Sequence, residues 1–454
     1  MERKRIARAV YVWTIARFHN RSYRTRPMQL DRRHDHDPYG WCIAIALGFL
    51  ALALWRIGVP TRYYFDEVHY VPAALKLLKM IPANREHPMF AKEVLAASIH
   101  FLGDRPFAWR IPSVMLGTLG LFAFSRSVWH ASKNGWATVA AMILLATNFM
   151  WFIQSRIAML DMTMASLAMV ALWQFGAALD AGSPGRARVR LMLAGLCMGL
   201  SIGAKWTSVP VMIVPGLTFL VLRLRESGWR IVGRSGAGPM PGISLAEAAL
   251  WLGLFPLAVY WLTYLPAMFY DRKPVLPFDF IGQHLKMLKL QDSVTKAHPY
   301  RSVWYQWVTD WRPIWYLFEN VDGARRGIIM LGNPLTLLAG LPAVFWALWA
   351  ALRHRRYDAL YFAVLYLLCI GMWVHNTKPV QFFYHYLLAA SFLMAVLALA
   401  LEQVARRKGR WRWLGAGTVA ASVALFVLFY PIIAGYPLPY LKAYNFWMWS
   451  PTWR

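Results

Sequence analysis

Residues 63–110 read YYFDEVHYVPAALKLLKMIPANREHPMFAKEVLAASIHFLGDRPFAWR. This stretch carries carboxylates, histidines and cations close together, and it lies between two apolar runs, 41–59 and 108–129, each about long enough to cross a bilayer. Most of the other loops carry only Lys and Arg. A mixed-charge loop held against a membrane is where we expect chemistry, although a solvated loop with a few ion pairs would have the same composition.

The composition is that of a membrane protein. Of the 454 residues, 58% are hydrophobic and only 15% are charged, far fewer than in a soluble chain of this size. Apolar runs recur along the whole chain and predict an all-α integral membrane protein with about eleven transmembrane helices. The predicted spans are roughly 41–59, 108–129, 136–153, 160–179, 191–204, 207–222, 245–268, 328–352, 360–374, 382–401 and 414–433.

The net charge of +28 is distributed in the way that sets membrane topology. Lys and Arg gather in short loops at alternate crossings, which favours a positive-inside arrangement over binding to nucleic acid. Residues 1–40 are then a basic cytoplasmic arm, too polar to be a cleaved signal peptide. The loops at about 60–107 and 269–327, and an aromatic tail at 436–454, fall outside. The three cysteines lie in apolar runs and form neither a disulfide framework nor a metal spacing.

The pair Asp66-Glu67 opens the outer loop at the membrane boundary. Adjacent carboxylates in a partly apolar setting repel each other, so one of them holds its proton more tightly. A carboxylate beside a lipid headgroup is suited to act as a general base towards a hydroxyl. The alternative is an acidic pair in the first turn of a helix.

The motif EHPMFAK, Glu86 to Lys92, predicts the start of a helix. Proline is favoured in a first helical turn, and the residues after Pro88 are amphipathic. We expect one helix there and another at about 68–80, both lying on the outer membrane surface. Lys92 either meets an anionic headgroup or extends its ammonium to the interface.

Three cations are placed against the membrane. Arg110 stands at the outer mouth of a predicted span, where a charge needs a partner. A phosphate suits the guanidinium fork; a pairing with Asp104 or Asp66 is the alternative. Arg156 and Asp161 lie at the ends of neighbouring spans and either form an ion pair or line a cavity. Lys205 runs against the positive-inside trend, which indicates a carboxylate or an anion beside it.

The stretch KPVQFFYHYLL, Lys378 to Leu388, brings histidine, lysine and aromatics to the start of another span. Aromatics beside His385 and Lys378 suit a sugar or a phosphate, and they also suit an interfacial aromatic belt. The sequence contains no P-loop, dinucleotide fingerprint, HExxH or GxSxG. A nucleotide-driven pump and the common hydrolases are therefore disfavoured, and a lipid-linked donor is expected at the outer face.

The motifs resemble those of one family. They are YYFDEVHYVPAA, EHPMFAK, RPFAWRIPSVMLGTLG, SRIAMLDMTMASL, GLSIGAKWTSV, DWRPIWYLFE, MLGNPLTLLAG and FFYHYLLAASFL. Their content and order resemble those of bacterial polyprenyl-phosphate-mannose-dependent protein O-mannosyltransferases (glycosyltransferase family 39, GT-C class). The resemblance covers roughly residues 41–435 and implies a GT-C transmembrane catalytic domain with amphipathic helices in its first outer loop.

Carried over position by position, the resemblance implies that Asp66 is the catalytic carboxylate, with Glu67 beside it. The substrate-binding residues that it implies are His87, Lys92, Arg110, Arg156, Asp161, Lys205 and His385. Two features depart from the family. Met89, Phe90 and Ala91 replace the usual Pro-Leu-Gly, and the large eukaryotic insert in the long outer loop is absent.

The function that the resemblance implies is inverting transfer of a hexose, mannose in this family. The donor is a polyprenyl phosphate, the acceptors are Ser or Thr hydroxyls of exported proteins, and the place is the outer face of a bacterial inner membrane. No metal or cofactor is expected; the partners are the lipid-linked donor, the protein acceptor and membrane lipids. Transfer to a lipid or glycan acceptor stays open. A lipid flippase is disfavoured because the predicted spans are nearly free of charge at their centres.

Overall fold

The computed structural model describes residues 35–228, 232, 240–293, 298–376, 378, 380–407 and 409–454. The chain divides into residues 1–36 and a second compact unit, Asp37–Arg454, whose fold is described below. The predicted cytoplasmic arm lies outside the described residues as far as residue 34.

The protein is a multi-span helical membrane protein, as the apolar runs predicted. Among the described residues, nine helical segments are long and apolar enough to cross a membrane. They are α5 (Pro106–Ser132), α8 (Leu160–Leu179), α9 (Pro184–Ala204), α10 (Val209–Ser227) with its preceding turn, the continuous α11 (Leu245–Ala249), η2 (Leu250–Leu254) and α12 (Phe255–Leu262), α16 (Pro334–His354), α17 (Tyr357–Val374), α18 (Leu387–Ala405) and α19 (Arg412–Ile433).

Two further predicted spans correspond to shorter apolar helices. These are α2 (Tyr39–Leu54) and α6 (Gly135–Ala146), of 16 and 12 residues, the second followed by the short α7 (Phe149–Gln154). Each of the eleven predicted runs therefore has a helix, but the count of eleven membrane crossings stays a prediction.

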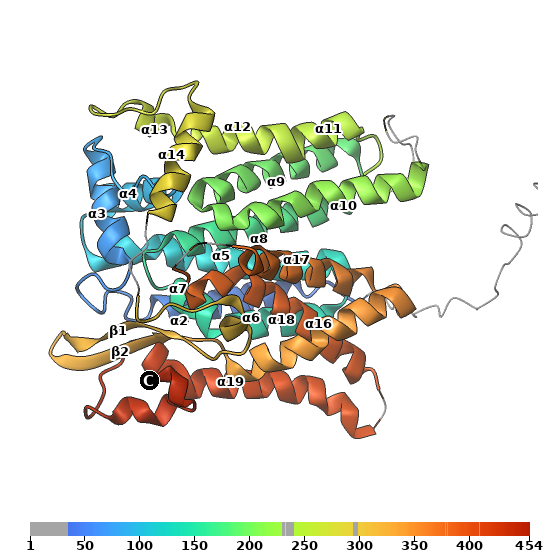
Figure 1. The fold of residues 1–454 in the computed structure, drawn as a ribbon. Helices are drawn as coiled ribbons and strands as arrows, with labels where there is room; N and C mark the ends of the chain where they lie inside the picture. The colour runs from blue at the N-terminus through green and yellow to red at the C-terminus, as the bar shows by residue number, and fades with distance from the viewer. Residues whose placement is uncertain are drawn as a thin grey trace, which may run out of the picture. The chain divides into compact units, whose positions relative to one another are not determined.

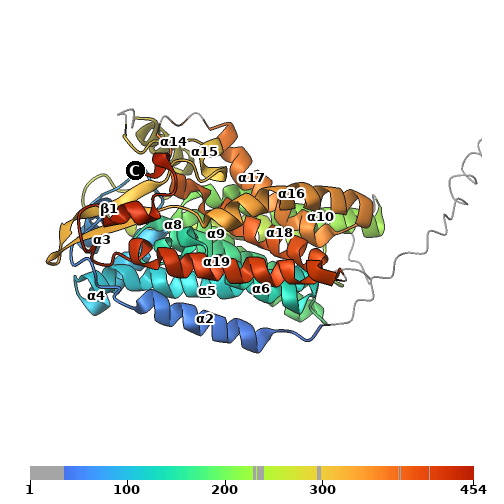
Figure 2. The same ribbon diagram turned by 90° about the horizontal axis from the view of Figure 1, so that it is seen from below.

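The long helices run side by side, with α8 and α18 at the centre (Figure 1). Their apolar windows are 78% and 83% buried inside the protein, against 28% for the window of α19. Helix α19 lies at the lower edge of Figure 1 and α2 at the lower edge of Figure 2, so both are peripheral. The central helices can be apolar all round because they meet only other helices, whereas the peripheral ones keep one face for lipid.

The shorter elements gather at one end of the helices, which we call the loop end (left in Figure 1). They are α3 (Glu67–Leu78), α4 (Phe90–Leu102), α13 (Leu265–Met268), α14 (Phe280–Asp292), α15 (Trp304–Val308) and the strands β1 (Ile314–Val321) and β2 (Ala324–Met330). The two helices predicted in the first loop are thus confirmed as α3 and α4.

The antiparallel hairpin of β1 and β2 is an addition to the predicted helical membrane fold and corrects one boundary. The span predicted to begin at residue 328 begins at Pro334, because residues 328–330 pair within β2. A short apolar run does not distinguish a strand from a buried helix. The register shifts between Trp315 and Leu317, so Tyr316 is an extra residue that has no partner on β2.

Two glycines of α9 allow close contact with the segment η2–α12. A Cβ atom at Gly195 would lie 2.1 Å from the carbonyl oxygen of Trp251, and one at Gly199 would lie 2.5 Å from that of Pro256. Small residues four apart let membrane helices approach backbone to backbone. Helix α9 and the segment η2–α12 therefore pack closely against each other along these turns.

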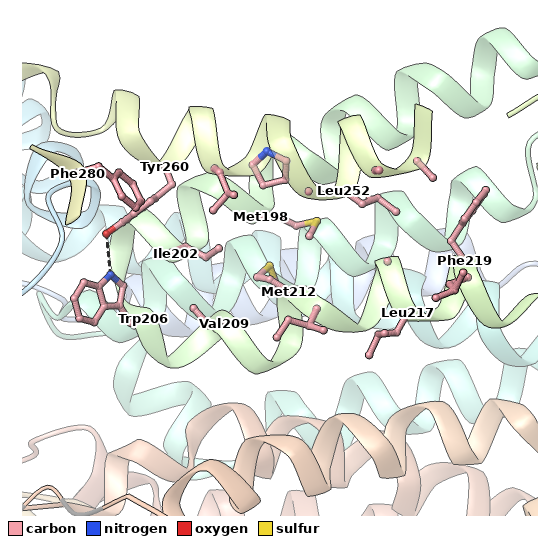
Figure 3. Close-up of a pocket in the computed structure, with 18 of the residues that line it drawn as sticks. Met198, Ile202, Trp206, Val209, Met212, Leu217, Phe219, Leu252, Tyr260 and Phe280 are labelled. Carbon is pink, nitrogen blue, oxygen red and sulfur yellow. Dashed lines mark hydrogen bonds between the residues drawn. The ribbon is translucent and has the colours of Figure 1, made fainter. Parts of the chain in front are cut away.

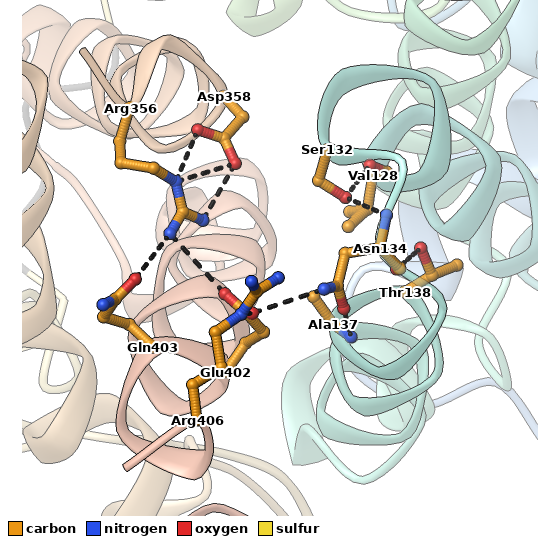
Figure 4. Close-up of polar contacts among 10 residues, drawn as sticks. All are labelled: Val128, Ser132, Asn134, Ala137, Thr138, Arg356, Asp358, Glu402, Gln403 and Arg406. Atoms are coloured by element: carbon orange, nitrogen blue, oxygen red, sulfur yellow. Dashed lines mark hydrogen bonds and ion pairs between the residues drawn. The ribbon is translucent and has the colours of Figure 1, made fainter. Parts of the chain in front are cut away.

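Charged residues tie the helix ends together opposite the loop end (Figure 4). The buried Glu402 of α18 lies 3.5 Å from the Arg356 guanidinium, which also donates to Asp358 at 2.9 Å. Asn134, before α6, donates to Glu402 at 3.3 Å, and Arg406 completes the cluster. Some of the basic residues at this end therefore also connect α6, α17 and α18.

Candidate active site

The Asp66-Glu67 pair lies where the chain leaves α2 and enters α3. Its two carboxylates point into different surroundings. Glu67 is fully buried and accepts from the guanidinium of Arg110 at 2.8 and 2.9 Å, from Ala158 N–H at 3.0 Å and from Tyr64 N–H at 3.3 Å. Glu67 therefore holds the loop against α5 and the segment before α8. It is the acidic residue of a first helical turn, the alternative reading of the pair.

Arg110 makes its hydrogen bonds to other residues of the protein rather than facing the opening of the site. Besides Glu67, it donates to the carbonyls of Ile57, Pro60 and Arg62 at 3.0, 2.7 and 3.1 Å. These bonds and the Glu67 pair use all five guanidinium N–H groups. The structure thus differs from the expectation that Arg110 contacts the donor phosphate.

The Asp66 carboxylate is the free member of the pair. In the part of the chain that the structure describes, it has no hydrogen bond or ion pair. Burial raises its pKa to about 6, an effect that Asp161 adds to and that Lys205, His69 and Lys378 oppose. A carboxylate with a pKa near neutrality is suited to accept a proton in catalysis.

Lys205 and Asp161 form a buried ion pair beside Asp66. Lys205 directly follows α9, and its Nζ lies 2.8 and 2.9 Å from the carboxylate oxygens of Asp161, in the first turn of α8. The ammonium also lies 5.0 Å from the ring centre of Tyr384. The expectation that Lys205 faces a carboxylate is confirmed, and the alternative pairing of Asp161 with Arg156 is wrong.

The Arg156 side chain instead binds the C-terminal end of α2. It donates to the carbonyls of Ala53 and Trp55 at 2.6 and 2.8 Å. The last carbonyls of a helix lack partners within it, so a buried guanidinium there stabilises the end. Arg156 and Arg110 therefore both anchor the segment that leads to Asp66.

Lys92 and His87 belong to the turn that precedes α4 and its first helical turn. The Lys92 ammonium is buried and donates to the carbonyls of Asn84 and His87 at 2.6 and 3.0 Å. Burial lowers its pKa to about 7. Neither predicted role of Lys92, at a headgroup or at the interface, fits this placement. Burial, then the charges of Lys205, Lys92 and Lys378, lower the pKa of His87 well below its ordinary value, so its ring is neutral.

His385 and Asp161, two of the substrate-binding residues that the resemblance implied, line the same small cavity. The Nδ1 atom of His385 is 2.9 Å from the Phe382 carbonyl oxygen, and its ring lies 4.2 Å from that of Trp373. Tyr384 lines the same cavity. Lys378 belongs to the same motif, and its positive charge lowers the pKa of both Asp66 and His87.

An apolar groove of about 920 Å³ has Trp206, the residue after Lys205, at one end (Figure 3). It runs between α9, α10 and the segment α11–α12, with α14 at its loop end. Among its lining residues are Met198, Ile202, Val209, Met212, Leu217 and Leu252. No single stretch of the sequence predicts this groove, because four separate segments build it.

The loop end of the groove is its polar end. The Trp206 indole N–H donates to the Tyr260 hydroxyl at 2.9 Å, and that hydroxyl lies 2.5 Å from the His284 ring nitrogen. The Trp206 and His284 rings stack with their centres 5.4 Å apart. Trp206 directly follows Lys205, so the polar end of the groove and the Lys205–Asp161 pair are built from neighbouring residues of the chain.

Comparisons with known proteins find similar chains. Residues 277–453 match the family described as the C-terminal four TMM region of protein-O-mannosyltransferase. A polyprenol-phosphate-mannose–protein mannosyltransferase of Mycolicibacterium smegmatis is 26% identical, over 91% of this chain and 93% of that protein. The protein of the same name from Corynebacterium glutamicum is 25% identical, over 92% of this chain and 94% of that one.

Two solved structures share the fold. The Saccharomyces cerevisiae Pmt1–Pmt2 complex, bound to the sugar donor, has a TM-score of 0.76 at 13% identity and 92% coverage of both chains. ArnT from Cupriavidus metallidurans, bound to undecaprenyl phosphate, has a TM-score of 0.53 at 16% identity, covering 86% of this chain and 71% of that one. The chain therefore shares its helical architecture with these two proteins.

Proposed function

We propose, on the premise that this chain belongs to the protein O-mannosyltransferase family, that it transfers mannose from a polyprenyl phosphate to Ser or Thr hydroxyls of exported proteins. The observation that carries the proposal is an apolar groove whose polar end contains Trp206, the residue that follows Lys205 in the chain, together with the Lys205–Asp161 pair, whose charges act on the free Asp66 carboxylate. We place the reaction at the outer face of a bacterial inner membrane, with the N-terminus in the cytoplasm. The reaction as proposed needs no metal or cofactor.

The groove supports a lipid-linked donor. Its wall is almost wholly apolar, so a polyprenyl chain gains the free energy of apolar burial there. The relatives named above carry polyprenol-phosphate-mannose in their names, and the ArnT structure holds undecaprenyl phosphate. With the tail in the groove, the phosphate lies beside the Lys205 ammonium. Lys205 rather than Arg110 supplies its countercharge.

The chemistry is a single displacement with inversion. The acceptor hydroxyl oxygen attacks the anomeric carbon while the bond from that carbon to the phosphate oxygen breaks. The hydroxyl proton goes to the Asp66 carboxylate, and the electron pair of the broken bond leaves with the phosphate. A phosphate is a weakly basic leaving group, so it needs charge stabilisation rather than a general acid, and Lys205 provides that charge.

The test is a transfer assay with purified protein in lipid. Radiolabelled polyprenyl-phosphate-mannose and a periplasmic protein extract are supplied to the wild type, to Asp66→Asn and to a control, Asp104→Asn. Asp104 is a carboxylate of the same loop that accepts from the Trp109 indole at 2.6 Å. We expect label in protein with the wild type and the control, and none with Asp66→Asn.

Two results would overturn the proposal in different ways. Label in lipid or glycan alone would contradict the protein acceptor and keep the transferase. Full transfer by Asp66→Asn would remove this carboxylate from the mechanism.

A further inference from the structure

The β-hairpin contacts the segment that leads to Asp66 at two places, the first of which is at residues 61 and 62. The backbone N–H of Thr61 donates to the Asp322 carboxylate at 3.0 Å, and the Thr61 hydroxyl contacts the same carboxylate. The next residue, Arg62, pairs with Glu319 of β1 at 2.5 Å. Residues 61 and 62 are thereby tied to β1 and the turn of the hairpin, more than 250 residues further along the chain.

The second contact between the hairpin and this segment is at Phe65, one residue before Asp66. The ring of Phe65 stacks on that of Tyr316, with ring centres 4.0 Å apart and 14° between the planes. Tyr384 meets the Phe65 ring edge-on at 5.9 Å. Phe65 has a φ of +50°, a left-handed conformation that a residue with a large side chain adopts only when its surroundings impose it.

Tyr316 is held in place independently of Phe65. It is the extra residue at the register shift of the hairpin, and such bulges turn a side chain in a new direction. Its side chain is buried, and its hydroxyl accepts from the Gln154 amide of α7 at 3.1 Å. The ring that supports Phe65 is therefore fixed from both the strand and a neighbouring helix.

We propose that Tyr316 is a positioning residue for the Asp66 carboxylate: its ring holds Phe65 in the left-handed conformation, and this sets where the next residue directs its side chain. The proposal rests on the function proposed above, in which Asp66 is the general base. A base must lie within hydrogen-bond reach of the proton it takes, and a misplacement of about 1 Å costs on the order of 100-fold in rate.

The Asp66 carboxylate has no partner among the described residues, whereas Glu67 beside it accepts from four N–H groups. Bonds between Tyr64 and Glu67 close the turn that contains Phe65 and Asp66, and the Asp66 carbonyl accepts from the N–H groups of the third and fourth residues after it. These bonds restrain the backbone on both sides of Phe65. The stacked contact with Tyr316 acts on the Phe65 side chain and favours its left-handed conformation.

The experiment compares Tyr316→Leu with Tyr316→Phe. The phenylalanine variant keeps the stacked ring and loses only the bond from Gln154, so we expect nearly wild-type transfer. The leucine variant loses the ring. We expect its kcat to fall about 10- to 100-fold, with the KM for polyprenyl-phosphate-mannose within about twofold of the wild-type value, because the loss is confined to the placement of the base.

Phe318→Leu is the matched control. This variant removes an aromatic ring from the same strand, but Phe318 packs on Trp315 and Tyr444 rather than on Phe65. We expect it to keep its kcat. An equal loss of kcat in Phe318→Leu and Tyr316→Leu would show general damage to the hairpin and overturn the proposal, as would an unchanged kcat in Tyr316→Leu.

Hydrogen exchange tests the positioning without reference to activity. In Tyr316→Leu, the backbone amides of residues 63–66 should exchange faster than in Tyr316→Phe, with no change in α18; equal exchange in the two variants would overturn the proposal. Failure of the proposed function has a different signature: an inactive wild type, or an active Asp66→Asn, leaves the difference in exchange intact.

Discussion

Replacing Arg110 by Met tests whether this residue holds the fold or binds the donor. The guanidinium makes two bonds to Glu67 and three to backbone carbonyls, and both side chains of the pair are fully buried. The Met variant leaves the Glu67 carboxylate in the protein interior without its cation. Breaking a buried pair from one side costs about 3–5 kcal/mol.

This cost translates into a measurable fall in thermal stability. At roughly 2 °C per kcal/mol, the lower end of the range for large domains, the unfolding midpoint should fall by about 6–10 °C. The midpoint is measured in detergent micelles as loss of the monodisperse peak after heating. Arg105→Met serves as the control, because Arg105 is an exposed residue of the same loop, and a surface change of this kind shifts stability by only about 0.5 kcal/mol.

A second variant separates the lost charge from the lost packing. Glu67→Leu combined with Arg110→Met removes both charges, and the double variant should be more stable than Arg110→Met alone, since an apolar replacement of a buried pair is often close to neutral. A midpoint for Arg110→Met equal to that of the wild type, together with lost donor binding, would refute the reasoning. It would place the guanidinium on the phosphate.

The remaining predictions concern the base, the countercharge, the groove and the orientation. Because burial raises the pKa of Asp66 to about 6, and only the ionised form accepts a proton, kcat/KM should fall tenfold per pH unit below about 6 and be level above it; a level profile down to pH 4 would contradict this. Lys205→Met should raise the KM for the donor about 10- to 100-fold, as expected for a lost charge-assisted bond, while Lys205→Arg keeps most of the affinity; equal KM values in the two would exclude a countercharge role. Met212→Trp should fill the groove and raise the KM for a full-length polyprenyl donor but not for one with a two-isoprene tail, measured by donor titration; a similar rise for both would point to damage elsewhere. A cysteine introduced at the fully exposed Phe278 should react in intact cells with a membrane-impermeant maleimide; labelling only after lysis would reverse the proposed orientation.

The sequence alone determined the class of fold, and it predicted the place of the chemistry. Each apolar run became a helix because a bilayer-length stretch of apolar residues satisfies its backbone only within itself. The helices α3 and α4 were predicted from amphipathic pattern and from Pro88. The Asp66 loop stood out because its mixed charges differ from those of the basic loops, and that contrast is visible without coordinates.

Only the tertiary structure decided which charged residues form ion pairs with each other. Glu67 and Arg110 are 43 residues apart, and Lys205 and Asp161 are 44 apart. Sequence spacing cannot rank the possible partners of a buried cation, since the packing of helices sets the distances. The same holds for the groove, which four segments enclose, and for the hairpin, whose short apolar strand β2 reads like the start of a helix. Function here depends on both levels: the residue types are local, but tertiary packing decides that Glu67 is paired and that the Asp66 carboxylate is free.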